Sequence, residues 1–173
     1  DRIVSIVGPG GIGKTRLAIE IGLEQAPSWP DGVWMIELAD VASAGLIPSA
    51  FADAVGVNVG GASDVWGDVL AWAHDRRSLL IVDNLESWID ECATLLGELI
   101  RLQGIAIVTT SREPLNIAAE TVYRLGPLDV PGRDASTVSA RHTPAVALFI
   151  DRARRVQPTM EFSGLRSSCD SVD

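Results

Sequence analysis

The sequence predicts an α/β fold, in which a parallel β-sheet is covered by helices on both faces. Two kinds of segment alternate along the 173 residues. Short, continuous apolar runs indicate buried strands, because strands of a parallel sheet are covered on both sides. Between them lie stretches with apolar residues at helical spacing. A glycine-rich loop follows the first apolar run, and a loop at that place is typical of the same fold class.

The expected strands are rich in β-branched and aliphatic residues, and most are preceded or followed by glycine, proline or charged residues. They cover residues 3–7, 33–38, 78–83 and 105–110, with a shorter fifth strand at 121–125. A helix is expected over 15–26, ending at Pro27, and another from Ile47 to near Gly56. Further helices should begin after a cap at Asp64, run through 92–99, and begin at Thr143-Pro144.

The domain organisation follows from the same pattern. We expect one domain over residues 1–156, a size that can bury a proper core. Residues 126–141 are polar and contain glycine and proline, which predicts a linker inside it. Residues 157–173 have weak periodicity and no core signal, so we expect a poorly structured tail.

Composition excludes several classes of protein. No apolar run approaches the roughly 18 residues of a membrane span, and the chain enters its first strand without a signal peptide. Cys92 and Cys169 have no metal-binding spacing, so neither a disulfide framework nor a zinc site is expected. These features predict a cytoplasmic protein without a membrane partner.

The net charge of −9 argues against direct nucleic-acid binding by this chain. A local basic cluster near the end is better explained as a solvated helix face or an interdomain contact. Its members are Arg141, Arg152, Arg154 and Arg155.

Residues 8–15 match the phosphate-binding loop pattern G-x-x-x-x-G-K-[ST], between an expected strand and an expected helix. The glycines allow successive backbone N–H groups to face phosphate oxygens beside a helix N-terminus. Lys14, the only lysine in the sequence, would reach the β- and γ-phosphates, and the Thr15 hydroxyl would contact Mg²⁺. The predicted nucleotide-binding residues are Gly8, Pro9, Gly10, Gly11, Ile12, Gly13, Lys14, Thr15 and Arg16.

An acid ends the expected strand at 78–83. Asp83 would hold Mg²⁺ beside Thr15, directly or through water; the alternative is a strand-end carboxylate that caps a turn. Its neighbour Asn84 can orient a water molecule but cannot take its proton, which predicts slow turnover. Glu86 is the candidate general base.

Arg112 follows the expected strand at 105–110. A guanidinium at this strand end could sense a γ-phosphate and stabilise transition-state charge; the alternative is a surface arginine in a loop ion pair. The predicted catalytic set is therefore Lys14, Asp83, Arg112 and Glu86. The sequence contains no Asn-Lys-x-Asp guanine-reading motif, which favours adenine.

Together these segments resemble the STAND class of P-loop signal-transduction ATPases, specifically the NB-ARC-like (AP-ATPase) domains of LuxR- and AfsR-like bacterial transcriptional regulators. The resemblance covers about residues 3–156 and rests on an ordered set of segments. They are Gly8 to Ala18, Asp31 to Ala39, Leu79 to Glu86, Thr109 to Leu115, Tyr123 to Leu128 and Ala145 to Arg154.

The resemblance implies a three-layer P-loop NTPase sandwich with sheet order 5-1-4-3-2, the Thr109 strand lying between the strands of the loop and of Asp83. It implies an ATP/ADP switch with Mg²⁺ on Thr15 and Asp83 and γ-phosphate sensing by Arg112. It also implies partners within a larger protein: helical, winged-helix, effector or repeat domains, and a nucleotide-dependent oligomer. Gly164-Leu165-Arg166-Ser167 lacks the proline of the family's Gly-Leu-Pro-Leu motif, so we expect a fragment.

Three functions remain open at this point. The leading one is an ATP/ADP-binding regulatory module with slow hydrolysis. A small-molecule phosphotransferase would share the loop and fold, although the sequence has no arginine-rich lid. A nucleotide-binding scaffold without turnover is the third.

Overall fold

The computed structural model describes residues 2–58, 64–132 and 136–157. The chain divides into two compact units, residues 1–126 and 127–173. The first unit contains the sheet and the phosphate-binding loop motif. The organisation predicted from the sequence, one domain over residues 1–156 and a poorly structured tail over 157–173, stays a prediction.

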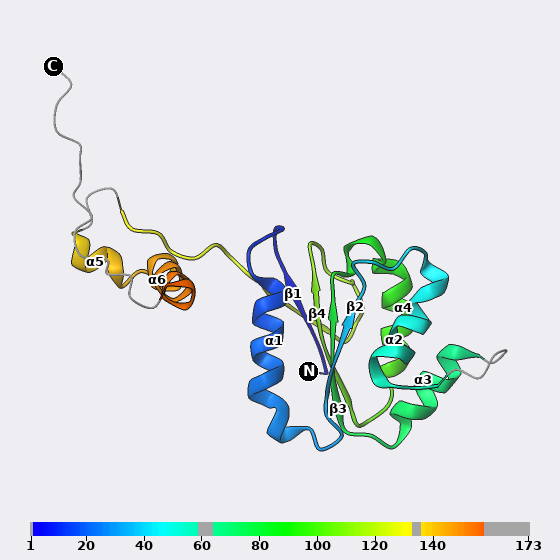
Figure 1. The fold of residues 1–173 in the computed structure, drawn as a ribbon. Helices are drawn as coiled ribbons and strands as arrows, with labels where there is room; N and C mark the ends of the chain where they lie inside the picture. The colour runs from blue at the N-terminus through cyan, green and yellow to red at the C-terminus, as the bar shows by residue number, and fades with distance from the viewer. Residues whose placement is uncertain (1, 59–63, 133–135, 158–173) are drawn as a thin grey trace. The chain divides into compact units, whose positions relative to one another are not determined.

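The first unit is built on a five-stranded parallel sheet (Figure 1). Its order is β2-β3-β4-β1-β5, which confirms the predicted 5-1-4-3-2 arrangement and α/β class. As expected, β4 lies between β1 and β3. The strands are β1 (Ile3–Val7), β2 (Val33–Glu37), β3 (Ser78–Asp83), β4 (Ile105–Ser111) and β5 (Glu120–Arg124).

Helices cover both faces of this sheet, so the predicted three layers are confirmed. Helix α1 (Lys14–Gln25) lies on one face, and three helices lie on the other (Figure 1). Those three are α2 (Ile47–Val55), α3 (Val65–His74) and α4 (Ile89–Leu99). Asp64 occupies the N-cap position of α3, but its side chain makes no capping hydrogen bond.

Alternate residues along the strands pack into two separate hydrophobic cores, one on each face of the sheet. In β3, Leu79 and Ile81 pack on the α1 side, whereas Leu80 and Val82 pack on the opposite side. The second core is the larger of the two, and Phe51 is fully buried within it, edge-on to Trp66. Because side chains alternate along a strand, a residue's parity decides which layer it joins.

Strand β5 departs from the expectation of a sheet covered on both faces. Its residues from Thr121 to Arg124 are exposed. The strand lies at the sheet edge and pairs with β1 alone among the strands of the described residues. Strand periodicity therefore identified the element correctly but overestimated its burial.

The second unit contains α5 (Thr137–Arg141) and α6 (Pro144–Val156). The sequence placed a linker over 126–141, and this is wrong for its last residues. The Ser136 hydroxyl accepts a hydrogen bond from the Ser139 backbone N–H, which caps a short helix there. The helix predicted at Thr143-Pro144 is confirmed. The tail from 158, with its Gly164–Ser167 segment, lies outside the described residues. None of the helices in the described ranges is long and apolar enough to cross a membrane.

Two helix glycines offer a matched test of the packing between α1 and the sheet. A Cβ added at Gly22 would lie 2.5 Å from Ile81 Cδ1 and 3.2 Å from Val33 Cγ1, whereas one added at Gly97 of α4 meets nothing within 4 Å. We expect Gly22→Ala to lower the free energy of unfolding by about 1–3 kcal/mol relative to Gly97→Ala, because overpacking against Ile81 and Val33 opposes the gain in helix propensity that both substitutions share. Gly97→Ala should raise the free energy of unfolding by up to about 1 kcal/mol through helix propensity. Urea unfolding measures both, and equal effects at the two positions would contradict this packing.

Candidate functional site

The loop of residues 8–13 connects β1 to the first turn of α1, and its glycines have distinct structural reasons. Gly11 and Gly13 have φ values of 74° and 103°, a region that side chains disfavour. Gly8 is held close to β5: a Cβ there would lie 2.8 Å from the backbone oxygen of Leu125. The sequence predicted the loop from its motif, but the contact with β5 required the fold.

Lys14 is the first residue of α1, and 9% of its surface is exposed. Its Nζ donates hydrogen bonds to the backbone oxygens of Gly8 and Pro9, at 2.9 and 3.1 Å. The ammonium group is therefore folded back against the start of the loop. Two carbonyl partners are weaker anchors for a cation than phosphate oxygens, which would form charge-assisted bonds.

Asp83 and Thr15 are brought together as the sequence predicted. The Thr15 Oγ1 atom lies 2.8 and 3.0 Å from the two carboxylate oxygens of Asp83, across 68 residues of sequence. A hydroxyl and a carboxylate are hard oxygen donors, and Mg²⁺ in proteins is commonly held by one or two such groups together with phosphates and water. Within the described part of the chain, no cluster of three or more histidine, cysteine or acidic residues could hold a metal. The hydroxyl of Thr15 and the carboxylate of Asp83 are oxygen donors that fit Mg²⁺ held in part by phosphates and water.

Thr110 is a site residue that the sequence did not single out. Its buried hydroxyl donates to Asp83 Oδ1 and accepts from the Asn84 backbone N–H at 3.1 Å. Asn84 itself has a left-handed backbone, with φ of 65°. Thr110 therefore holds both the carboxylate and the turn that follows β3. The signal available in the sequence was a threonine at the end of the strand beside that of Asp83.

Arg112 lies just past the end of β4, where it makes the loop ion pair that was the alternative interpretation; γ-phosphate sensing stays a prediction. Its Nε lies 3.2 Å from Glu86 Oε1 in this ion pair. Its Nη2 faces the phosphate-binding loop: a Cβ added at Gly10 would lie 3.7 Å from that nitrogen. The structure therefore places Glu86 against Arg112, and no hydrogen bond joins Glu86 to Thr15 or Asp83 among the described contacts.

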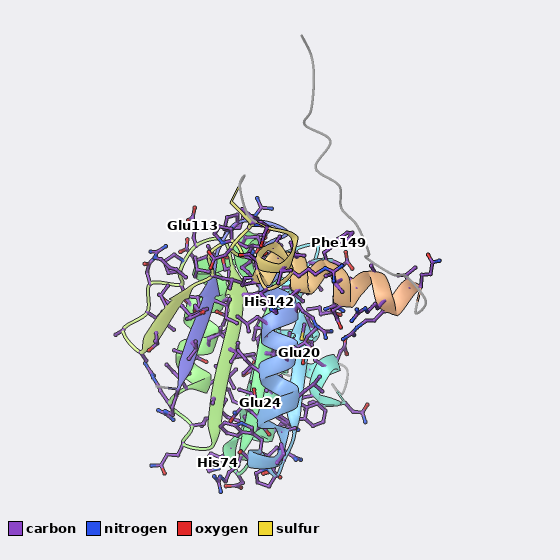
Figure 2. All side chains as sticks on the ribbon, turned by 90° about the vertical axis from the view of Figure 1, so that its left-hand side faces the viewer. Glu20, Glu24, His74, Glu113, His142 and Phe149 are labelled. Carbon is purple, nitrogen blue, oxygen red and sulfur yellow. The ribbon has the colours of Figure 1, made fainter. Side chains whose placement is uncertain are left out.

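Arg16, the last residue of the predicted nucleotide-binding set, is directed along α1. Its guanidinium pairs with Glu20 one turn further on, and both side chains are half-exposed. Figure 2 shows Glu20 and Glu24 on this helix. The ion pair lies on the outer surface of α1, and whether Arg16 contributes to binding stays a prediction.

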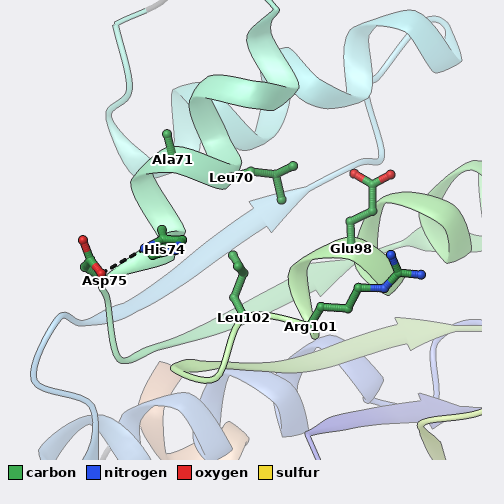
Figure 3. Close-up of a pocket in the computed structure, with 7 residues that line it drawn as sticks. All are labelled: Leu70, Ala71, His74, Asp75, Glu98, Arg101 and Leu102. Carbon is green, nitrogen blue, oxygen red and sulfur yellow. Dashed lines mark hydrogen bonds and ion pairs between the residues drawn. The ribbon is translucent and has the colours of Figure 1, made fainter.

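A hollow of about 660 Å³ lies between α3 and the end of α4 (Figure 3). Leu70, Ala71 and Leu102 contribute apolar surface, and His74 pairs with Asp75 at its edge. Since α3 leads into β3 and Leu102 precedes β4, this hollow lies at the amino ends of the strands. The phosphate-binding loop lies at their carboxyl ends, so the two places are separate.

The buried Cys92 adds no chemistry to the site. Burial, with a smaller effect from Glu91, raises the pKa of its thiol to about 12. The group is therefore an uncharged thiol at neutral pH and packs as a small apolar side chain.

Comparison with known proteins adds sequence relatives and a structural neighbour. No protein-family model matches the chain. It is 35% identical over 159 residues to a Mycobacterium tuberculosis protein named "Putative HTH-type transcriptional regulator", covering 91% of this chain and 17% of that protein. A second protein of that organism, whose name assigns no function, is 32% identical over 157 residues, covering 90% of this chain and 37% of its own length.

Among solved structures, Cdc6p from Pyrobaculum aerophilum superposes with a TM-score of 0.57 at 14% identity. The match covers 72% of this chain and 39% of that protein, and it shows a shared fold. The chain thus has a P-loop ATPase-like fold and spans only 17% and 37% of the length of the two mycobacterial proteins that it matches.

A matched pair of threonines tests the role of Thr110. Thr110→Val keeps the shape but removes the donor to Asp83 and leaves the Asn84 N–H without its acceptor. Thr109→Val removes one buried bond, to Ser5 Oγ, on the other face of the sheet. Each should cost about 1–3 kcal/mol of stability. Only Thr110→Val should also weaken Mg²⁺-dependent nucleotide binding, measured by calorimetric titration; equal loss of binding in both variants would contradict a specific role.

Proposed function

We propose that the chain is an ATP/ADP-binding regulatory module with slow ATP hydrolysis, part of a larger signalling or transcriptional-regulator protein. One observation carries the proposal: Lys14 and the hydrogen-bonded pair Thr15–Asp83 meet at the N-terminus of α1, beside a loop with two left-handed glycines. This arrangement offers a cation, backbone N–H groups and hard oxygen donors to a phosphate chain. The proposed nucleotide-binding residues are those of positions 8–16.

Each residue has a distinct part in this proposal. Lys14 would exchange its two carbonyl partners for phosphate oxygens. Thr15 and Asp83 would hold Mg²⁺, which supplies positive charge to the phosphate oxygens when bound. Thr110 would keep the Asp83 carboxylate oriented, because it is bonded to that group already.

Arg112 would distinguish ATP from ADP. Its Nη2 faces the Gly10 segment of the loop, where a terminal phosphate would add a partner for the guanidinium. A contact made with the triphosphate alone contributes differential affinity, and differential affinity is what a ligand needs to shift a conformational equilibrium.

We propose slow ATP hydrolysis because the residue after Asp83 is an asparagine. Asn84 has a side-chain amide, which can orient water but cannot accept its proton. A base role for Glu86 stays a prediction, and the structure disfavours it, because Oε1 is paired with Arg112 and Oε2 is buried away from an attacking water. The same observation about Asn84 favours a second candidate function, a nucleotide-binding scaffold that does not turn over.

The wider context is also proposed. The chain spans 17% and 37% of the two mycobacterial relatives, so other domains would read the nucleotide state. Similarity to a protein named as a transcriptional regulator supports a role in control of transcription, as expected for a STAND-class, NB-ARC-like module. Adenine preference, a nucleotide-dependent oligomer, the absence of direct nucleic-acid contact and a cytoplasmic location belong to the same proposal.

Calorimetric titration with ATP, ADP and GTP, with and without Mg²⁺, tests the proposal. We expect ATP and ADP to bind and Lys14→Ala to weaken binding at least about tenfold, because the charge-assisted bonds to phosphate are lost. Arg101→Ala is the control, since Arg101 lies at the separate α3–α4 hollow. Equal, negligible binding by wild type and Lys14→Ala would contradict the proposed function. Binding without phosphate release would favour the scaffold.

A further inference from the structure

The Arg112 guanidinium is paired with Glu86 through Nε and faces the phosphate-binding loop through Nη2. Its Nε is paired with Glu86 Oε1, and its Nη2 is the nitrogen nearest to the Gly10 segment. A guanidinium is planar and rigid, so fixing Nε and the side-chain direction also fixes where the two terminal nitrogens point. The contact with Glu86 thus leaves the outer N–H groups of Arg112 available on the side of the loop.

The side chains of Arg112 and Glu86 differ in how far they are exposed to solvent. The Arg112 side chain is 65% exposed, whereas that of Glu86 is 20% exposed. Glu86 belongs to the short 3₁₀ turn Leu85–Ser87 directly after β3, and Leu85 within that turn is fully buried. The carboxylate is therefore the fixed partner, and the long arginine side chain is the one that would lose its position without it.

The second carboxylate oxygen of Glu86 gives a further reason for the ion pair with Arg112 to be retained. Glu86 Oε2 is buried and accepts no hydrogen bond from the described residues. The other oxygen, Oε1, is paired with Arg112. Loss of that contact would leave a largely buried charge with no partner on either oxygen, which is unfavourable. The pair is thus expected to persist when a ligand approaches the outer nitrogens.

We infer that Glu86 is a positioning residue for Arg112: it holds Nε so that the terminal nitrogens are preorganised to bind the terminal phosphate of a nucleoside triphosphate. The inference rests on the proposed function and specifies how that site tells triphosphate from diphosphate. Preorganisation increases affinity because the long side chain does not have to be ordered during binding. This role differs from that of a general base, which acts on water. It also differs from that of a competing latch, by which we mean an ion pair that keeps Arg112 away from the phosphate.

The test compares affinities for ADP and for the β,γ-imido analogue of ATP, both with Mg²⁺, by calorimetric titration. We expect Glu86→Ala to lower the preference for the triphosphate analogue about tenfold, with ADP affinity unchanged. Glu86→Gln keeps an acceptor for Nε and should lose about threefold. Glu113→Gln is the matched control, because it removes one negative charge from the same hollow beside Arg112. It should leave the preference unchanged.

A double-mutant cycle separates positioning from direct effects. In an Arg112→Ala background, Glu86→Ala should change the triphosphate preference no further. A higher triphosphate affinity in Glu86→Ala would show a competing latch, and an unchanged preference with lost hydrolysis would show a base; either result overturns the inference. If wild type binds no nucleotide, the proposed function fails as well. If Arg112→Ala abolishes the preference and Glu86→Ala does not, this inference alone fails.

A measurement without nucleotide completes the test. The Nε–H signal of Arg112 in a ¹⁵N NMR spectrum, assigned with Arg112→Lys, should exchange with water more slowly in wild type than in Glu86→Ala. Thermal unfolding of each variant shows that the fold is retained. An Nε–H exchange rate that is the same in wild type and Glu86→Ala would overturn the inference regardless of ligand.

Discussion

The hydrogen bonds around the Asp83 carboxylate connect the parts of the molecule on which the site depends. Thr15 from α1 and Thr110 from β4 both bind this group, and Thr110 also accepts from the backbone of Asn84. One helix and two neighbouring strands are thus joined at the carboxyl edge of the sheet. Because buried polar groups are costly when unpaired, these bonds constrain the register of β3 against β4 as well as the start of α1.

The two faces of the sheet differ in the size of their cores and in whether they carry the candidate site. The face covered by α2, α3 and α4 carries the larger core, with Phe51 and Leu96 fully buried. The α1 face has a smaller core and carries Asp83, Thr110 and the loop at one end. The helix that begins with the phosphate-binding residues also covers that smaller core, so packing of α1 and geometry of the loop are coupled.

The Arg112–Glu86 pair shows how an exposed side chain acquires a direction. Arg112 lies past the end of β4, where packing alone would leave it free. A carboxylate from the turn after β3 meets it because parallel strands bring their carboxyl ends to the same edge. Two residues of no special spacing in the sequence thereby form one unit that faces the loop at Gly10.

Local chemistry in the sequence determined the strands, most helices, the loop motif and the acid at the end of β3. Each follows from periodicity, glycine positions or a strand-end charge, which are properties of short segments. The family resemblance supplied the strand order. The tertiary structure alone decided the partners: Thr110 on Asp83, Glu86 on Arg112, Leu125 against Gly8, and the exposed edge at β5. These depend on which elements lie side by side, and single-segment patterns carry no information about neighbours across the sheet.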